Sequence, residues 1–80
     1  MASEIAWREV APGLWETSCG RGRVQRLHGV WRMYLWLDRG FEQVTSPAGR
    51  KLYSFDGYDA RQRVVSMIHA AEQAQREVMV

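Results

Sequence analysis

The sequence predicts an α+β domain in which an antiparallel β-meander of three to five strands carries one C-terminal helix on one face. Residues 30–37 alternate between two kinds of side chain, as expected of a strand. Beyond residue 57 the apolar residues recur at steps of three and four, as expected of a helix. With 80 residues, 46% of them hydrophobic, residues 1–80 form one small domain with room for one sheet and one helix.

The central strand, residues 30–37, has two different faces because a strand sends successive side chains to opposite sides. One face is wholly apolar: Trp31, Met33, Leu35 and Leu37. The other combines a cation with two large aromatics: Arg32, Tyr34 and Trp36. We therefore expect one face of this strand to pack in the core and the other face to carry the function.

The remaining strands are predicted at residues 5–10, 14–19, 23–28, 41–45 and 50–55. Glycine and proline separate them, most clearly at residues 46–49. Asp38-Arg39-Gly40 is typical of a hairpin turn, with Gly40 expected at positive φ. The strand at 14–19 would include Cys19 as a packed residue.

The helix is predicted to begin after Asp56, whose side chain is expected to accept a hydrogen bond from the backbone N–H of Asp59. Glu72 and Arg76 have the i,i+4 spacing of a helical ion pair. The core is expected to consist of the apolar face of strand 30–37 against Val64, Ile68 and Ala71. The full apolar stripe of the helix is Ala60, Val64, Met67, Ile68, Ala71, Ala74 and Val78.

Residues suited to catalysis or metal binding are scarce. Cys19 is the single cysteine, which excludes an intramolecular disulfide and a cysteine-based zinc site. His28 and His69 lack a metal-ligand spacing, and Asp56 and Asp59 are explained by the helix start. We expect no enzymatic activity, no metal and no cofactor. With no signal peptide and no membrane-spanning segment visible, the sequence predicts a soluble cytoplasmic protein.

The charge distribution suggests a binding surface. The net charge is only +2, but no acidic residue lies between Thr17 and Leu37. Arginine binds phosphate well and aromatic side chains stack on bases, so the sequence predicts a nucleic-acid or partner-binding site. Its candidate residues are Arg21, Arg23, Arg26, Arg32, Tyr34 and Trp36.

Two simpler interpretations of these residues stay open at this stage. Ten of the eleven cations are arginine, which a GC-rich genome would produce without any functional cause. Tyr34 and Trp36 would also be explained if Trp7 and Trp15 covered them in a second small core, because a small domain needs large apolar groups.

Within residues 22–71, a basic strand contains Val24 and Arg26, Trp31 stands at the start of the next strand, and residues 50–55 are followed by Asp56. In these features the segment resembles the three-stranded-sheet-plus-helix DNA-binding domains of plant ethylene-response factors and of the arm-site-binding end of tyrosine recombinases. The resemblance implies that the sheet enters the DNA major groove through Arg23, Arg26, Arg32 and Trp36. This chain differs in its longer turn at residues 46–49 and in two additional N-terminal strands.

Two functions follow from these observations. The first is a non-enzymatic module that binds DNA or RNA through the arginine- and aromatic-bearing face. The alternative is a phage or mobile-element accessory protein that acts by protein–protein interaction, such as an inhibitor of a host CRISPR-type defence complex. A homodimer closed through the same face is a third interpretation.

Overall fold

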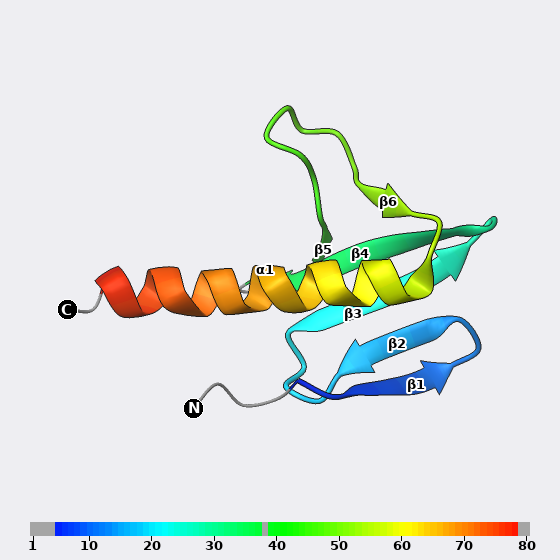
Figure 1. Ribbon diagram of the computed structural model, residues 1–80, viewed down its shortest axis with the longest axis horizontal. Coiled ribbons are helices and arrows are strands. Elements are labelled where there is room, and N and C mark those ends of the chain that lie inside the picture. Colours follow the sequence, from blue (N-terminus) through cyan, green and yellow to red (C-terminus); the bar gives the residue numbers. More distant parts are fainter. Residues whose placement is uncertain (1–4, 38, 79–80) are drawn as a thin grey trace.

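The computed structural model, which describes residues 5–37 and 39–78, contains one antiparallel sheet with one helix packed on it (Figure 1). The sheet is a meander of five strands in chain order, to which a sixth, short strand is added beside β4. This confirms the predicted α+β class. The elements are β1 (Trp7–Ala11), β2 (Leu14–Thr17), β3 (Gly22–Leu27), β4 (Val30–Leu37), β5 (Gly40–Gln43), β6 (Tyr53–Ser54) and α1 (Gly57–Val78).

The core lies between α1 and the two central strands, β3 and β4. Each of these strands contributes one buried side chain, and the helix contributes three that are spaced by four residues, as expected of one helical face. Helix and sheet approach closely at Gly22, where a Cβ atom would lie 2.5 Å from Cγ1 of Val64. A side chain at position 22 would therefore separate the two layers. The buried core residues are Val24, Met33, Ala60, Val64 and Ile68.

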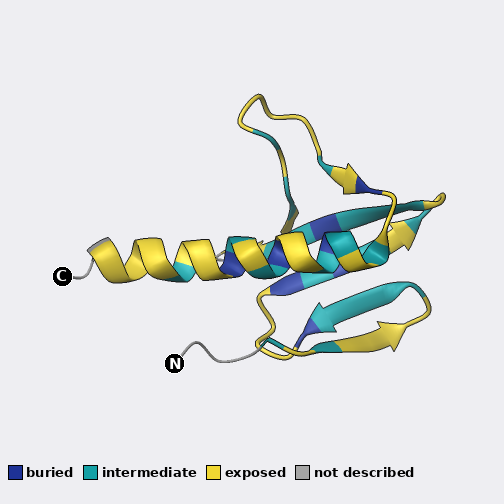
Figure 2. Ribbon diagram, viewed as in Figure 1, coloured by how far each residue is buried: buried dark blue, intermediate teal, exposed yellow. Residues whose placement is uncertain are grey.

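The apolar stripe of α1 is buried only along the first half of the helix. Ala60, Val64 and Ile68 are buried as predicted, whereas Ala71 and Ala74 are exposed. The expected core role of Ala71 is therefore wrong, because α1 continues past the end of the sheet (Figure 2). The side chain of Val78 lies outside what the structure describes.

Leu37, also predicted in the core, is 51% exposed at the end of β4. Its neighbours on the same face, Trp31 and Leu35, do pack against the core. The alternation along β4 is thus confirmed, and only its last apolar residue lies beyond the cover of the helix.

Several strand ends differ from the prediction because local hydrogen bonds intervene. The second strand ends at Thr17, whose Oγ1 accepts from the backbone N–H of Gly22 at 2.9 Å, and Cys19 is consequently exposed rather than packed. The third strand ends at Leu27, because His28 (φ 53°) and Gly29 (φ 79°) form a two-residue turn with positive φ at both positions. Such a turn matches the twist of a hairpin.

The predicted turn at 38–40 and the predicted strand at 50–55 also need correction. Asp38 lies outside the described residues, and Gly40 does not adopt the left-handed conformation expected for it. The strand at 50–55 is reduced to β6 and an isolated bridge between Thr45 and Lys51. Leu52, between the bridge and β6, packs against the core.

The start of α1 is built as expected. The carboxylate of Asp56 accepts from the backbone N–H groups of Tyr58 and Asp59 at 3.3 and 3.4 Å. Asp59 then accepts from the hydroxyl of Ser54 at 2.9 Å and pairs with Arg63 at 3.0 Å. These contacts hold the short strand β6 against the first helical turn.

The ion pair that Glu72 makes is not the predicted one. Its Oε1 lies 3.1 Å from NH1 of Arg21, in the loop before β3, rather than pairing with Arg76. The contact joins residues 51 positions apart in the chain. It ties the projecting half of the helix to the sheet.

Candidate nucleic-acid interface

The side of the sheet that faces away from α1 is called the open face here. Directly paired residues of antiparallel strands point to the same side, so the strand register defines its members. α1, the only helix among the described residues, crosses the other side (Figure 1). The members of the open face include Arg8, Glu16, Arg23, Gln25, Arg32, Tyr34, Trp36, Phe41, Gln43 and Tyr53.

One row of the open face crosses five strands in register. Arg8 is paired with Glu16, Glu16 with Arg23, Arg23 with Tyr34, and Tyr34 with Gln43. NH2 of Arg23 lies 3.1 Å from Oε2 of Glu16. The arginines of this face outnumber its one carboxylate three to one, so the face has a positive formal charge.

Two further groups complete the open face. In a second row Gln25, Arg32 and Tyr53 are neighbours, and Cζ of Arg32 lies 5.9 Å from the centre of the Tyr53 ring. At the end of β4, Trp36 is paired with Phe41. Their ring centres are 5.2 Å apart with the planes at 84°, an edge-to-face contact.

Phe41 also supports Arg23, because the guanidinium carbon of Arg23 lies 4.2 Å from the centre of the Phe41 ring. Arg23 is therefore held between a carboxylate and an aromatic ring, a cation–π arrangement. Trp36 and Tyr53 remain 47% and 45% exposed. The open face thus combines fixed positive charge with two half-exposed rings.

Three buried nitrogen atoms on this face have no hydrogen-bond partner in the described protein. They are Nε of Arg23, Nε of Arg32 and Nε2 of Gln43. Arg23 and Gln43 flank Tyr34 on its two neighbouring strands, and Arg32 is two residues from Tyr34 along β4. These three atoms have almost no accessible surface, so a ligand on the open face would meet the terminal N–H groups of Arg23 and Arg32 instead.

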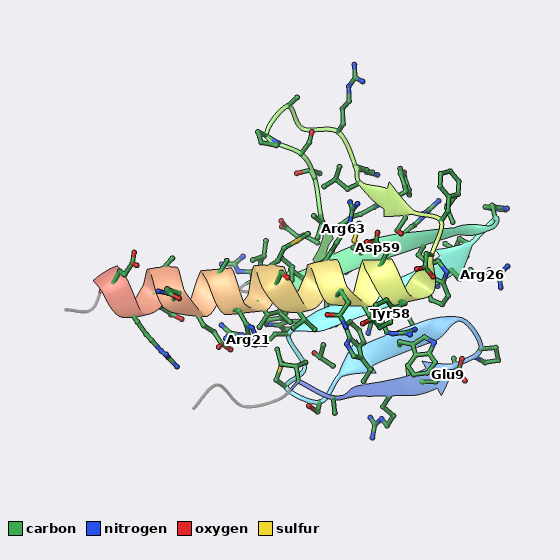
Figure 3. The ribbon with its side chains drawn as sticks, viewed as in Figure 1. Glu9, Arg21, Arg26, Tyr58, Asp59 and Arg63 are labelled. Atoms are coloured by element: carbon green, nitrogen blue, oxygen red, sulfur yellow. The ribbon has the colours of Figure 1, made fainter. Side chains whose placement is uncertain are left out.

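The six predicted site residues divide into two groups. Arg23, Arg32, Tyr34 and Trp36 share the open face. Arg26 lies two residues beyond Val24 and therefore points to the helix side. Arg21 lies in the loop before β3 and pairs with Glu72. Figure 3 shows Arg21 and Arg26 near opposite ends of β3.

The sequence-based site omitted six residues of the open face: Arg8, Glu16, Gln25, Phe41, Gln43 and Tyr53. Each lies on a strand that was expected, and the period of two assigns each to one of two faces. The missing information was the strand register, which decides which faces of neighbouring strands coincide.

The second small core considered for Tyr34 and Trp36 does not form. The N-terminal hairpin extends the edge of the sheet instead of folding over it. Its tryptophans, Trp7 and Trp15, pack against the core on the helix side. Cζ of Arg61 on α1 lies 4.9 Å from the centre of the Trp15 ring. Tyr34 and Trp36 therefore keep an uncovered side.

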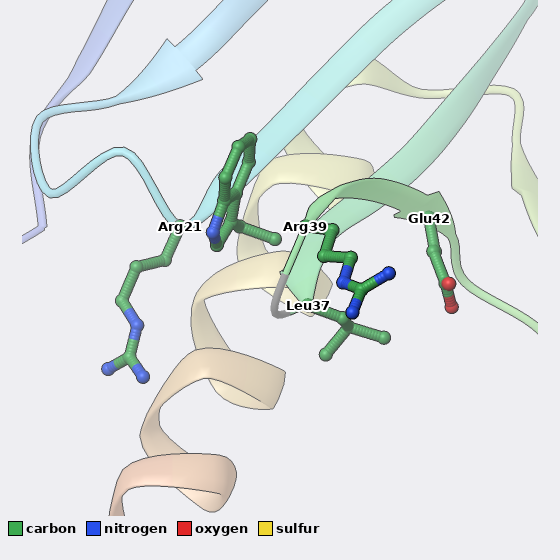
Figure 4. Close-up of a pocket in the computed structure, with 5 residues that line it drawn as sticks. Arg21, Leu37, Arg39 and Glu42 are labelled. Atoms are coloured by element: carbon green, nitrogen blue, oxygen red, sulfur yellow. The ribbon is translucent and has the colours of Figure 1, made fainter.

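One hollow, of about 230 Å³, lies at the start of β1 beside Arg8, and two others lie at the end of β4. Arg21, Trp36, Leu37, Arg39 and Glu42 line a wide, solvent-open depression of about 870 Å³ (Figure 4). A narrower apolar groove between β4 and α1 holds about 80 Å³. Small-molecule sites are usually enclosed and measure about 300–1,000 Å³. The wide depression has such a volume but is open to solvent, and the other two hollows are smaller, so none resembles an enclosed small-molecule site.

Within the described part of the chain, no group of three or more histidine, cysteine, aspartate or glutamate residues is placed to hold a metal ion. No helix there combines the length and the apolar character needed to cross a bilayer. No family model matches the chain, and no significant match was found among curated proteins or solved structures. The open face is thus the feature from which a function can be argued.

Proposed function

We propose that this protein is a non-enzymatic binding module that binds nucleic acid through the open face. The observation that supports this most is the composition of that face: three arginines, one glutamate and a series of aromatic rings, on the side of the sheet that α1 leaves uncovered. Arginine pairs with phosphate in bidentate geometry, and exposed rings stack on bases.

The test compares two arginines on neighbouring strands but on opposite sides of the sheet. Arg32→Gln removes a positive charge from the open face, and Arg26→Gln removes the same charge from the helix side. Binding of labelled DNA and RNA is followed by fluorescence anisotropy from about 50 to 200 mM salt. We expect R32Q to weaken binding and to reduce the salt slope by about one, the change expected for one lost phosphate contact.

R26Q is the matched control and should leave affinity nearly unchanged. Equal losses in R26Q and R32Q would indicate a general effect of net charge rather than a site. Absence of binding at about 50 mM salt, where phosphate contacts are strongest, would contradict the proposal outright.

A protein partner is the second candidate. The observation that favours it is the exposure of two large aromatic side chains at the start of α1, Phe55 at 88% and Tyr58 at 64%. Exposed aromatics are frequent anchors of protein interfaces. The inhibitor role considered from the sequence would be one form of this candidate, and a homodimer another.

Sedimentation at several concentrations separates the homodimer from the other forms. A mass that increases with concentration in the unmodified chain, and remains that of a monomer in Trp36→Ala, would place the open face in a self-interface. A constant monomer mass would exclude that form and leave a different protein as partner.

A further inference from the structure

The width of the sheet decides which form of nucleic acid the open face can accept. Adjacent strands are spaced by about 4.8 Å, so five strands in sequence span about 19 Å. The major groove of B-DNA is about 12 Å wide and admits a helix or a narrow β-ribbon. Three strands, about 10 Å across, would fit such a groove. β1 and β2 extend this sheet beyond that limit, so the groove-inserted geometry of the three-stranded domains is obstructed here.

The aromatic side chains suit stacking on separate bases. Trp36 and Tyr53 are about half exposed. In contrast, the guanidinium of Arg23 covers the face of the Phe41 ring, and the ring centres of Phe41 and Trp36 are 5.2 Å apart. Phe41 therefore holds Trp36 in place rather than offering a ring of its own. In a duplex the base faces are already stacked on one another, so exposed rings can stack only on unpaired bases.

The polar groups between these rings suit the acceptors of a backbone or of unpaired base edges. Tyr53 is paired with Arg32 near one end of β4, and Trp36 lies at the other end. The half-buried side chains of Arg23 and Arg32 lie on the same face beside these rings, so their terminal N–H groups can donate to acceptors there. Only one carboxylate, Glu16, is present among the open-face members, and it already pairs with Arg23.

We infer that the ligand of the open face is single-stranded nucleic acid, with Trp36 and Tyr53 as stacking platforms and Arg32 and Arg23 as donors to the chain that joins the stacked bases. This inference rests on the proposed function and narrows it. It also assigns the N-terminal hairpin a role in selectivity, because the hairpin makes the sheet too wide for the groove.

The experiment compares one labelled oligonucleotide as a single strand with the same strand annealed to its complement, in DNA and in RNA, at about 50 mM salt. We expect the single strand to bind at least about tenfold more tightly, because stacking contributes to it alone. Binding of the duplex with equal or greater affinity would overturn the inference while leaving the proposed function intact. Failure of every probe to bind would overturn both.

Variants test the stacking positions directly. Trp36→Leu should reduce single-strand affinity by about fivefold to 100-fold, the range found for loss of one stacked base, whereas Trp36→Phe should retain most of it. Tyr58→Leu removes an exposed aromatic from α1, on the other side of the sheet, and should change nothing.

If circular dichroism shows that Trp36→Leu does not fold, Tyr53→Leu is the second variant, and we expect it to reduce single-strand affinity independently. Its ring is 45% exposed, so removal leaves the core intact. Unchanged single-strand affinity in whichever of these two leucine variants is folded would overturn the stacking role of that ring. A loss as large in Tyr58→Leu would show that the effect is not specific to the open face.

Discussion

The two sides of the sheet differ in how strictly their residues are constrained. On the helix side Val24 and Met33 are fully buried, and Gly22 leaves no space for a Cβ atom beneath Val64. On the open face, Trp36 and Tyr53 are about half exposed. β4 contributes residues to both sides of the sheet, so successive residues of this one strand are alternately buried under α1 and located on the open face. The helix side determines the fold, whereas packing constrains the residues of the open face less.

The largest effect on stability is expected when a residue on the helix side of β4 is truncated, and the same truncation on the open face is the comparison. Met33→Ala removes a fully buried side chain and should lower the free energy of unfolding by about 2–5 kcal/mol. Trp36→Ala removes a larger side chain that is 47% exposed and should cost about 1 kcal/mol. Urea denaturation measures both. Losses of similar size would contradict the asymmetry between the two sides.

The close approach of α1 to β3 predicts a smaller loss. In Gly22→Ala the new methyl group would meet Val64 at 2.5 Å and Ile68 at 3.0 Å, so the free energy of unfolding should fall by about 1–3 kcal/mol. Gly40→Ala is the matched control, because no atom lies within 4 Å of its Cβ position and its φ is not in the left-handed region. It should change stability by about 0.5 kcal/mol or less. Thermal denaturation of the two variants should therefore rank them clearly.

The smallest effect on stability should come from Glu16→Gln on the open face. Its ion pair with Arg23 is partly exposed, so the loss should be about 1 kcal/mol or less. If the open face binds nucleic acid, removal of this carboxylate should tighten binding about two- to fivefold in anisotropy titrations. Glu9→Gln makes the same charge change on the helix side. An equal gain in both variants would indicate net charge rather than the open face.

The candidate site was predicted in part. Arg32, Tyr34 and Trp36 were assigned to one face correctly, because alternation along a single strand requires no knowledge of other strands. Arg26 was grouped with them by its nearness in sequence, although it follows Val24 by two positions and so points to the core side. Tyr53 lies within the predicted strand at 50–55, but its position beside Arg32 depends on a pairing between distant segments.

The sequence by itself determined the central strand, the capped start of α1 and the α+β class, because these depend on local periodicity and on hydrogen bonds within a few residues. Tertiary structure alone decided that the N-terminal hairpin widens the sheet instead of covering it. It also decided that Glu72 pairs with Arg21 rather than with Arg76. These outcomes depend on register and on where the helix extends past the sheet, and both are set by the packing of the whole chain rather than by any single segment.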